Sequence, residues 1–419
     1  MGAIRRRRPG TGPDPKLPLV AIFSLHYPPE RTGNAPYAGA LARGLVARGS
    51  RVRVIAGHPH YPEREFAAGY GQWSTTDSSG GVATTRLRHY LPRKLTSLSR
   101  LASELSFGAR LLLARWGHPD VVVLVSPALF ATAMAVARAK LSFRRPRIVV
   151  WVQDLYSLGV TETNTGGGAV VWFMKLVEST TLRAADDVVV IHDRFAAFVT
   201  KSLGVDSERV TVVRNWTHLP VLPPTDPSAI RKIHGWPSET TVVLHAGNMG
   251  NKQGLENVVN AARLADAQQL PLLFVLLGDG NQRSALEALA TDVTRLQFVD
   301  PIGDDTFQST LAAADILLVN ERTGVSEMSV PSKLTSYFNS GRPVVAATDP
   351  FGATAGEINA ASGGLVVQSG APQILVNACL ELRQNPRRSA QLGSNGLEYR
   401  KHNLSEDASI NRYAALIYG

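Results

Sequence analysis

Short, uniformly apolar segments alternate along the chain with longer segments whose apolar residues recur at helical spacing. The first apolar segment is Leu19–Leu25, and Arg51–Ala56 is the next. Between them, apolar residues recur at i, i+3, i+4 and i+7, at Ala38, Leu41, Ala42 and Leu45. This pattern predicts a strand, a helix that ends near Gly49 and a second strand, which is the unit that a parallel crossover needs.

The same alternation recurs in two series. Segments rich in Val and Leu, without apolar–polar alternation, are typical of parallel strands covered on both faces. The first series contains Val121–Val125, Ile148–Val152, Val188–Ile191 and Val210–Val213. The second contains Val242–Leu244, Leu272–Leu277, Ile316–Val319, Val344–Ala347 and Leu365–Val367. We therefore predict an α/β fold of two Rossmann-like, doubly wound domains that face a cleft.

Proline and glycine mark the expected boundaries of these domains. Residues 1–16 are a Pro-, Gly- and Arg-rich basic tail without periodicity, which predicts disorder. Prolines cluster between residues 220 and 227, so we expect a linker over residues 220–235. The domains are then predicted at 17–219 and 236–402. Residues 403–419 are expected to form a C-terminal helix that crosses back to the N-terminal domain.

Composition narrows the class of protein. The chain has 419 residues and one cysteine, Cys379, which excludes an internal disulfide framework and any multi-cysteine metal site. The apolar run Val121–Ala137 is broken by Ser126 and Pro127 and is shorter than the roughly 20 residues of a membrane span, so we predict a strand, a turn and a helix. No hydrophobic stretch follows Arg5–Arg8, which argues against a secretory signal. We expect a cytoplasmic protein.

Charge is unevenly distributed. Residues 1–219 contain 29 Lys and Arg against 15 Asp and Glu, a net charge of +14, and the remainder contains 15 against 19, a net charge of −4. The basic half predicts an anionic partner, such as a phospholipid surface, a phosphorylated substrate or nucleic acid. A solvated basic face with a disordered tail is the alternative.

One basic segment suggests which partner this is. Leucines and basic residues share Pro92–Trp116, the basic ones being Arg93, Lys94, Arg100, Arg110 and Arg115. A basic amphipathic helix here would lie on the anionic inner face of the cell membrane. Alternatively, its leucines pack on the sheet and its arginines are solvated. Because no aromatic-rich recognition module accompanies the charge, we expect no nucleic-acid partner.

Several common active-site motifs are absent from the sequence. It has no Gly-x-Gly-x-x-Gly fingerprint, no phosphate-loop motif and no Asp-x-Asp, which argues against a diphosphate held through a divalent metal. Instead, Gly247–Gly254 links a strand to a helix, so its amides, the helix dipole and Lys252 could bind a diphosphate without metal. The loop at Gly33 could let a substrate approach the backbone. Each loop could equally be an ordinary turn.

The stretch 327–345 is the most informative. Glu327 precedes Pro331, which is expected in the first turn of a short helix that ends at Gly341. This stretch resembles the donor-binding signature of family 4 glycosyltransferases, whose two Rossmann-like domains form the GT-B fold. His26–Glu30, Gly247–Asn257 and Pro331–Leu334 resemble the subgroup that synthesises colanic acid and other exopolysaccharides.

This resemblance implies a donor site in the second domain. Its residues are Gly247, Asn248, Lys252, Gly278, Pro331, Ser332, Lys333 and Ser336. Lys252 matches a lysine that binds the donor diphosphate, whereas Asn248 stands where the family usually has an arginine. Ser336 replaces the glutamate that usually binds the ribose. Glu327 matches the other family glutamate only out of register by one.

The resemblance also implies a reaction centre on the first domain. Gln153 stands where many relatives have a histidine, and the subgroup tends to have Gln-Asp there, so Gln153 and Asp154 join Glu327 as candidate catalytic residues. A helix cap is the alternative role for Asp154. Gly33 and Asn34 are the candidate acceptor or phosphate loop.

The sequence therefore predicts a glycosyltransferase that uses a nucleotide-diphosphate sugar as co-substrate and needs neither metal nor other cofactor. The resemblance implies retention of anomeric configuration and a glycan or lipid-linked acceptor in cell-surface polysaccharide synthesis. The alternatives are a small soluble metabolite as acceptor, or a non-catalytic scaffold that binds nucleotide sugars.

Overall fold

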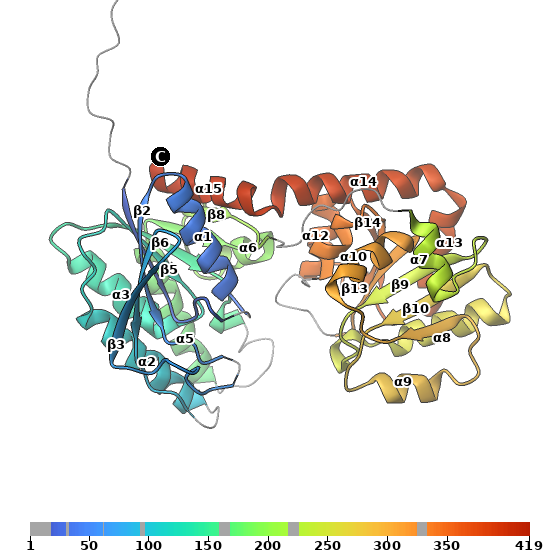
Figure 1. Ribbon diagram of the computed structural model, residues 1–419, viewed down its shortest axis with the longest axis horizontal. Coiled ribbons are helices and arrows are strands. Elements are labelled where there is room, and N and C mark those ends of the chain that lie inside the picture. The colour runs from blue at the N-terminus through green and yellow to red at the C-terminus, as the bar shows by residue number, and fades with distance from the viewer. Residues whose placement is uncertain are drawn as a thin grey trace, which may run out of the picture. The chain divides into compact units, whose positions relative to one another are not determined.

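The computed structural model (Figure 1) describes residues 18–30, 33–61, 63–92, 97–158, 168–216, 226–324 and 333–419. The strands are β1 Leu19–Ser24, β2 Arg51–Gly57, β3 Ser74–Ser79, β4 Val82–Leu87, β5 Val121–Val125, β6 Arg147–Val152, β7 Asp187–Val190, β8 Val210–Val212, β9 Thr241–Ala246, β10 Leu272–Leu277, β11 Leu296–Val299, β12 Ile316–Asn320, β13 Val344–Thr348 and β14 Gly364–Gln368. The helices are α1 Ala35–Ala47, α2 Ser97–Leu113, α3 Leu129–Leu141, α5 Gly168–Ala184, α6 Asp193–Lys201, α7 Pro227–His234, α8 Glu256–Ala267, α9 Arg283–Leu289, α10 Asp304–Ala313, α11 Lys333–Asn339, α12 Ala353–Ala361, α13 Pro372–Gln384, α14 Pro386–Asn403 and α15 Glu406–Tyr418.

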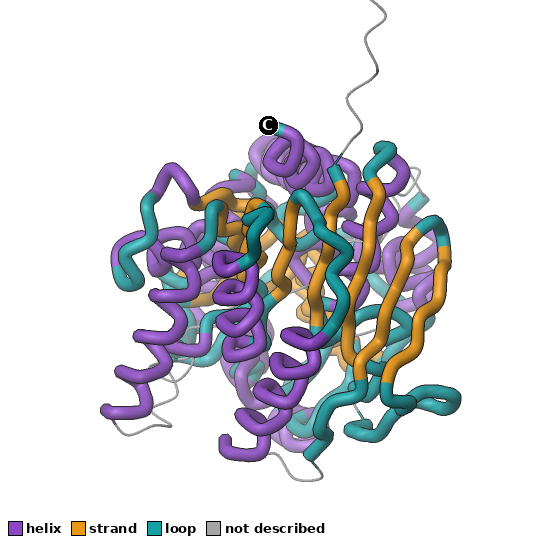
Figure 2. Tube along the Cα trace, turned by 90° about the vertical axis from the view of Figure 1, so that its left-hand side faces the viewer, coloured by secondary structure: helices purple, strands orange, loops and turns teal. Residues whose placement is uncertain are grey.

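The first sheet has the strand order β3-β4-β2-β1-β5-β6-β7-β8. Strand β1 pairs in parallel with β2 and β5, β2 pairs in parallel with β4, and β3 is antiparallel to β4. Figure 2 shows these strands side by side with helices packed against them. The order reverses between β1 and β5, and in such sheets ligands bind outside the carboxyl ends of the strands at this switch point.

The second sheet is entirely parallel, in the order β11-β10-β9-β12-β13-β14. Its chain order reverses between β9 and β12. The loops that follow β9, β10 and β12 therefore lie on adjacent strands at one edge of the sheet.

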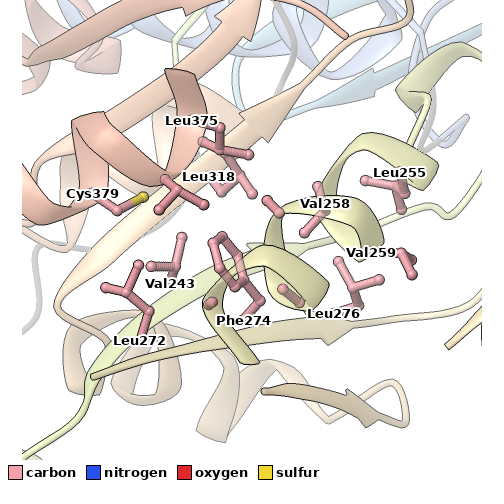
Figure 3. Packing of buried hydrophobic residues seen from close by; sticks show 14 of the residues in the cluster. Val243, Leu255, Val258, Val259, Leu272, Phe274, Leu276, Leu318, Leu375 and Cys379 are labelled. Atoms are coloured by element: carbon pink, nitrogen blue, oxygen red, sulfur yellow. The ribbon is translucent and has the colours of Figure 1, made fainter. Parts of the chain in front are cut away.

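Both faces of the second sheet are buried. Alternate residues of a strand point to opposite faces, so Val243 and Phe274 pack with α8 and α13, and Val242 and Leu244 pack in a separate cluster with Tyr337 of α11. Figure 3 shows the first of these clusters, in which Phe274 and Leu276 of β10 meet Val258 and Leu375 from the covering helices. Burial on both faces explains why these strands are continuous apolar runs in the sequence.

These observations confirm the predicted fold class of two doubly wound α/β sheets. The run Val121–Ala137 divides into β5 and the start of α3, as its polar interruptions predict. Three strands were not predicted: β3, β4 and β11. Strand β3 is polar and almost wholly exposed and β11 is half-exposed at an edge of its sheet, so neither shows an apolar run.

The described residues within 1–149 and 414–419 form one compact unit, and the described residues within 150–413 form another. Within the first unit, the hydroxyl of Tyr418 in α15 lies 2.5 Å from the Ser50 Oγ atom. Helix α7 lies in the stretch 220–235 that the sequence predicts to be a linker, and it begins after Asp226, whose carboxylate accepts a hydrogen bond from the Ser228 amide. The predicted domain boundaries stay a prediction.

None of the helices that the structure describes combines the length and the hydropathy required to cross a membrane.

Candidate active site

The loops after β9 and β10 hold each other through their backbones. The Gly247 amide donates to the Leu277 carbonyl over 2.9 Å, and the Met249 amide donates to the Asp279 carbonyl over 2.8 Å. Because β9 and β10 are adjacent parallel strands, both loops lie at the carboxyl edge of the second sheet.

Glycine permits this close approach. A Cβ atom on Gly278 would lie 2.1 Å from the Gly247 carbonyl oxygen, and Gly278 has a φ of +133°. A Cβ atom on Gly280 would lie 2.5 Å from the Met249 carbonyl oxygen. Glycine at these positions therefore lets the two loops pack backbone against backbone, with Gly247 and Gly280 half-buried and Gly278 buried.

Lys252 lies on the first of these loops, in a single 3-10 turn that precedes α8, and its side chain is exposed. The end of β12 holds this turn in place, because the Asn320 side-chain amide donates to the carbonyls of Gln253 and Gly254 over 2.7 and 2.9 Å. Asn248 is also exposed. The structure therefore presents Lys252 on a fixed loop beside the start of a helix.

Lys333 begins α11 and reaches back to β9. Its Nζ atom donates to Nε2 of His245 over 3.2 Å, and the His245 Nδ1 atom donates to the Leu318 carbonyl over 3.2 Å. Burial, followed by the Lys333 charge, lowers the pKa of His245 well below its ordinary 6.5, so the ring is neutral and its Nε2 atom accepts. One turn later, the Tyr337 hydroxyl accepts a hydrogen bond from the Ala246 amide over 2.8 Å. These contacts fix α11 across the end of β9.

The Lys333 ammonium lies at the glycine loop. A Cβ atom on Gly247 would be 3.5 Å from the Lys333 Nζ atom. The structure thus brings Gly247, Gly278 and Lys333 together, as predicted for a donor site, and places Ser336 half-buried on the same helix. The sequence reasoning missed His245, although a histidine at the end of an otherwise apolar strand was a usable signal.

Arg322 was also missed. It follows β12, its side chain is exposed, and its backbone amide donates to the Lys252 carbonyl over 2.8 Å. A Cβ atom on Gly254 would lie 2.9 Å from the Arg322 Cα atom, so the two segments are in direct contact. Arg322 is therefore a second cationic residue next to Lys252. It follows β12, whereas Asn248 follows β9.

The predicted donor-site residues Pro331 and Ser332 and the candidate catalytic residue Glu327 lie outside the described residues.

Gln153 and Asp154 directly follow β6 on the first sheet. The Gln153 and Asn215 side-chain amides pair reciprocally, over 2.8 and 3.1 Å. Asp154 is exposed, and its Oδ1 atom accepts a hydrogen bond from the Leu155 amide over 2.9 Å. A helix cap accepts from an amide two or three residues on, so this bond is not a capping bond, and the capping alternative stays a prediction.

A buried carboxylate on α5 fixes the residues after Asp154. Glu178 accepts hydrogen bonds from the amides of Tyr156 and Ser157 over 2.9 and 3.2 Å, and also from the Ser157 hydroxyl. Burial raises the pKa of Glu178 above its usual 4.5. Sequence reasoning did not single out Glu178, because an acidic residue in a helix is normally exposed.

Gly33 and Asn34 lie between β1 and α1. Gly33 adopts a φ of +63°, and no protein atom would come within 4 Å of a Cβ atom there, so the turn itself requires glycine. Asn34 is buried, and its Nδ2 atom donates to the Ser126 carbonyl over 3.2 Å. Asn34 therefore joins the loops after β1 and β5 at the switch point of the first sheet.

Two doubly wound α/β sheets with loops at the carboxyl ends of their strands are the architecture of the GT-B fold, which the solved structures of WaaG and a sucrose-phosphate synthase share. Residues 32–216 match the glycosyl transferase 4-like domain, and residues 240–385 match the glycosyl transferases group 1 domain. Over 348 residues the chain is 30% identical to the putative colanic acid biosynthesis glycosyl transferase WcaI of Escherichia coli K12, covering 79% of this chain and 84% of that protein. The chain therefore belongs to the family of glycosyltransferases that includes WcaI.

Two further similarities are to a second relative and to a solved structure. The chain is 29% identical over 197 residues to a GDP-mannose-dependent monoacylated α-(1-6)-phosphatidylinositol monomannoside mannosyltransferase of Corynebacterium glutamicum, covering 46% of this chain and 49% of that protein. The fold is similar to that of HepE from Anabaena, solved in complex with UDP, with a TM-score of 0.64, 16% identity, and coverage of 95% of this chain and 99% of that one.

Proposed function

We propose that this glycosyltransferase transfers a sugar from a nucleotide-diphosphate sugar to an acceptor in cell-surface polysaccharide synthesis. The observation that carries the proposal is the contact between the glycine loops after β9 and β10, with the Lys333 ammonium beside Gly247. HepE, which has the same fold, was solved with UDP. The relatedness to WcaI supports an acceptor in polysaccharide synthesis.

The donor diphosphate would lie on these glycine loops. Loss of the nucleotide diphosphate places negative charge on its phosphate oxygens, and preorganised cations and amides stabilise that charge. Lys333, Lys252 and Arg322 can supply the positive charge, with Arg322 standing in for the arginine that Asn248 replaces. We propose on this basis a reaction that needs no metal and, from the family resemblance, retains the anomeric configuration.

The candidate catalytic residues follow β6 and precede α11 in the chain. We propose that Gln153 and Asp154 lie at the donor sugar, with Glu327 contributing from the segment before α11. Gly33 and Asn34 would shape the acceptor side at the switch point. The proposal assumes domain boundaries at 17–219 and 236–402. With these boundaries, the first domain binds the acceptor and the second binds the nucleotide-sugar donor.

We further propose a lipid-linked acceptor that is reached at an anionic membrane surface. The Corynebacterium relative, by its name, acts on a phosphatidylinositol mannoside. In α2, Phe107 and Leu111 are buried, so part of this helix packs on the protein, as the alternative reading of its sequence predicts. Four of its leucines are exposed, namely Leu98, Leu105, Leu112 and Leu113. Arg93 and Lys94 lie outside the described residues.

Helix α5 also exposes apolar side chains, and two of them are aromatic. Trp172 is 65% exposed and Phe173 is 48% exposed, and Val170 and Leu176 are also exposed. Lys175 is the one charged residue among positions 168–177. Aromatic residues beside a lysine suit the interface between lipid headgroups and acyl chains, and the net charge of +14 in residues 1–219 favours anionic lipid.

The donor proposal is tested with purified protein and a panel of nucleotide-diphosphate sugars. We expect one nucleotide to raise the thermal midpoint, because ligand that binds only the native state stabilises it. We also expect slow donor hydrolysis that is lost in Lys333→Ala and Asp154→Ala. Full turnover in both variants would refute the site assignment, and nucleotide binding without turnover in the wild type would indicate a scaffold.

Flotation with vesicles of phosphatidylglycerol and phosphatidylcholine tests the membrane proposal. We expect Trp172→Ser with Phe173→Ser to reduce flotation more than Leu112→Ser with Leu113→Ser, because the aromatic pair offers more apolar area. A Phe351→Ser variant is the control, since Phe351 is 89% exposed outside both helices. Equal flotation by all variants would refute the proposal and favour a soluble acceptor.

A further inference from the structure

Histidines gather on the loops that follow three adjacent strands of the first sheet. His26 follows β1, His58 and His60 follow β2, and His89 follows β4. The rings of His26 and His60 stack with centroids 5.0 Å apart, and His89 meets His60 edge-on at 4.9 Å. This histidine cluster lies at the carboxyl edge of the sheet, next to the switch point.

A buried carboxylate organises the cluster. The Glu30 side chain is 2% exposed and accepts hydrogen bonds from the His26 Nδ1 atom and the backbone amides of His60 and Tyr61, over 2.8, 2.8 and 3.0 Å. Burial by itself raises the pKa of Glu30, but the hydrogen bonds, with His26 first among them, lower it below its usual 4.5 overall. The carboxylate is therefore ionised, and it can only accept.

These contacts determine where each ring carries its proton. Because Glu30 accepts, the His26 Nδ1 atom must donate. The His60 Nδ1 atom lies 2.8 Å from the His58 carbonyl, which also only accepts, so this atom donates as well. In a neutral imidazole the other nitrogen, Nε2, then accepts. Burial lowers the pKa of His60 below 6.5, which keeps its ring neutral.

The two rings remain accessible. The His26 side chain is 20% exposed and the His60 side chain 10% exposed. Tyr61, whose ring centroid lies 5.6 Å from that of His26, is 50% exposed. The cluster therefore offers the acceptor nitrogen of His60, with the His26 ring beside it, next to an exposed aromatic face.

We propose that His26, His60 and Tyr61 form a binding subsite for the acceptor saccharide. The Nε2 atom of His60 accepts a hydrogen bond from one sugar hydroxyl, the Nε2 atom of His26 hydrogen-bonds a second, and the Tyr61 ring packs against C–H groups of the same sugar. Glu30 is a positioning residue that fixes the His26 tautomer. When a sugar hydroxyl donates its proton to an imidazole nitrogen, the lone pairs of its oxygen point away from the ring. That oxygen can then attack the donor sugar. This subsite rests on the proposed function.

A divalent cation is the competing occupant, because one ligand atom each from His26, Glu30 and His60 lie within 4.8 Å of one another. Metal ligation requires a nitrogen without a proton. The Nδ1 atoms that face Glu30 carry their protons in hydrogen bonds to Glu30 and to the His58 carbonyl. The contacts therefore favour a hydroxyl-bearing ligand over a metal ion.

The test uses the full chain with octyl glucoside and octyl mannoside as saccharide probes. Saturation-transfer NMR without donor measures saccharide binding, and thermal shift with UDP and GDP measures the donor site. We expect His26→Gln and His60→Gln each to weaken saccharide binding about fivefold to tenfold, the loss of one hydrogen bond. Nucleotide shifts should match those of the wild type, which also shows that the variants fold. His402→Gln, at a histidine whose side chain is 76% exposed on α14, is the control.

Glu30→Gln separates positioning from direct contact. The glutamine amide can accept from His26 as before but carries no charge, so we expect a smaller loss than in His26→Gln. Unchanged saccharide binding in both histidine variants, or equal losses of saccharide and nucleotide binding, would overturn the subsite. Stoichiometric Zn²⁺ in the purified chain that His26→Gln abolishes would overturn it in favour of a metal site. Failure of the donor proposal is distinct, since nucleotide shifts would be absent while the saccharide result still stands.

Discussion

The loops at the carboxyl edges of the two sheets differ in chemistry. Those of the second sheet expose glycine backbone and cations, with Lys333 held by a neutral histidine and Lys252 on a fixed turn. Those of the first sheet expose imidazoles and a tyrosine around the buried charge of Glu30. Amides and ammonium groups suit an anion, whereas neutral acceptors suit hydroxyls.

Under the two proposals above, one architecture recognises two kinds of ligand. In both sheets the strands provide position only, and ligand chemistry depends on the residues just beyond their ends. The difference between the sheets also bears on the charge distribution. The loops proposed to bind the donor carry cations locally although residues 220–419 have a net charge of −4, and we therefore propose that the +14 of residues 1–219 serves a membrane surface or an anionic acceptor.

Removing the Lys333 charge is expected to have the largest effect. Lys333→Ala should lower kcat for transfer about 100-fold, the size of losing one preorganised electrostatic group at a developing charge. Steady-state kinetics with the donor from the nucleotide panel measures it. Lys401→Ala, at a lysine exposed on α14, should leave kcat unchanged. An equal effect in the two variants would show that Lys333 has no special role.

The second test places a side-chain atom at the contact between the loops that follow β9 and β10. Gly278→Ala places a Cβ atom 2.1 Å from the Gly247 oxygen at a φ of +133°, so we expect about 2–3 kcal/mol of lost stability and weaker nucleotide binding. Denaturant unfolding measures this. Gly356→Ala is the matched control, because no atom lies within 4 Å of its Cβ position in α12 and alanine favours a helix. Similar losses in both variants would contradict the tight loop contact.

The third test removes the two exposed cations near the proposed donor site, in the variants Lys252→Ala and Arg322→Ala, and compares their nucleotide affinity. Each should weaken nucleotide-diphosphate binding about fivefold to tenfold, since an exposed charge contributes roughly 1 kcal/mol. Calorimetric titration with the nucleotide diphosphate and the monophosphate measures it. The loss should be greater for the diphosphate. Wild-type affinity in Arg322→Ala would exclude Arg322 as the substitute for the arginine missing at position 248.

The smallest effect concerns acid stability on the histidine side. Burial lowers the pKa of His89 to about 3, so between pH 6.5 and 3 the unfolded chain binds a proton that the folded chain does not. Stability therefore falls as the pH falls through this window. From pH 7 to pH 5.5, this one histidine costs about 1 kcal/mol, and His89→Phe should lose that much less. Urea unfolding at both pH values measures it, and a pH dependence like that of the wild type would contradict it.

Much of the fold could be predicted from the sequence. Strands buried on both faces, such as β5 and β10, have the predicted bounds because an uninterrupted apolar run has few other stable placements. Strand β3 was missed because its exposed residues carry no apolar signal. Its pairing with β4 through backbone hydrogen bonds defines it instead.

The candidate site could be predicted only in part. Glycines and Lys333 on the donor loops were identified from their motifs, but His245, Arg322 and Glu178 were not. Each acts through a partner far away in sequence: His245 holds Lys333, Arg322 contacts the Lys252 turn, and Glu178 binds the amides after Asp154. Sequence spacing contains no information on such contacts.

The sequence by itself determined the fold class of two doubly wound α/β sheets, the glycine loops at strand ends and the family of the protein, because hydrophobic periodicity and short motifs are local properties. Only the tertiary structure decided which polar groups meet. Strand order places β4, β2 and β1 side by side, so histidines up to 63 positions apart, from His26 to His89, form one cluster around Glu30. Proton positions and charge states there follow from burial and hydrogen-bond partners, which exist only once the chain has folded.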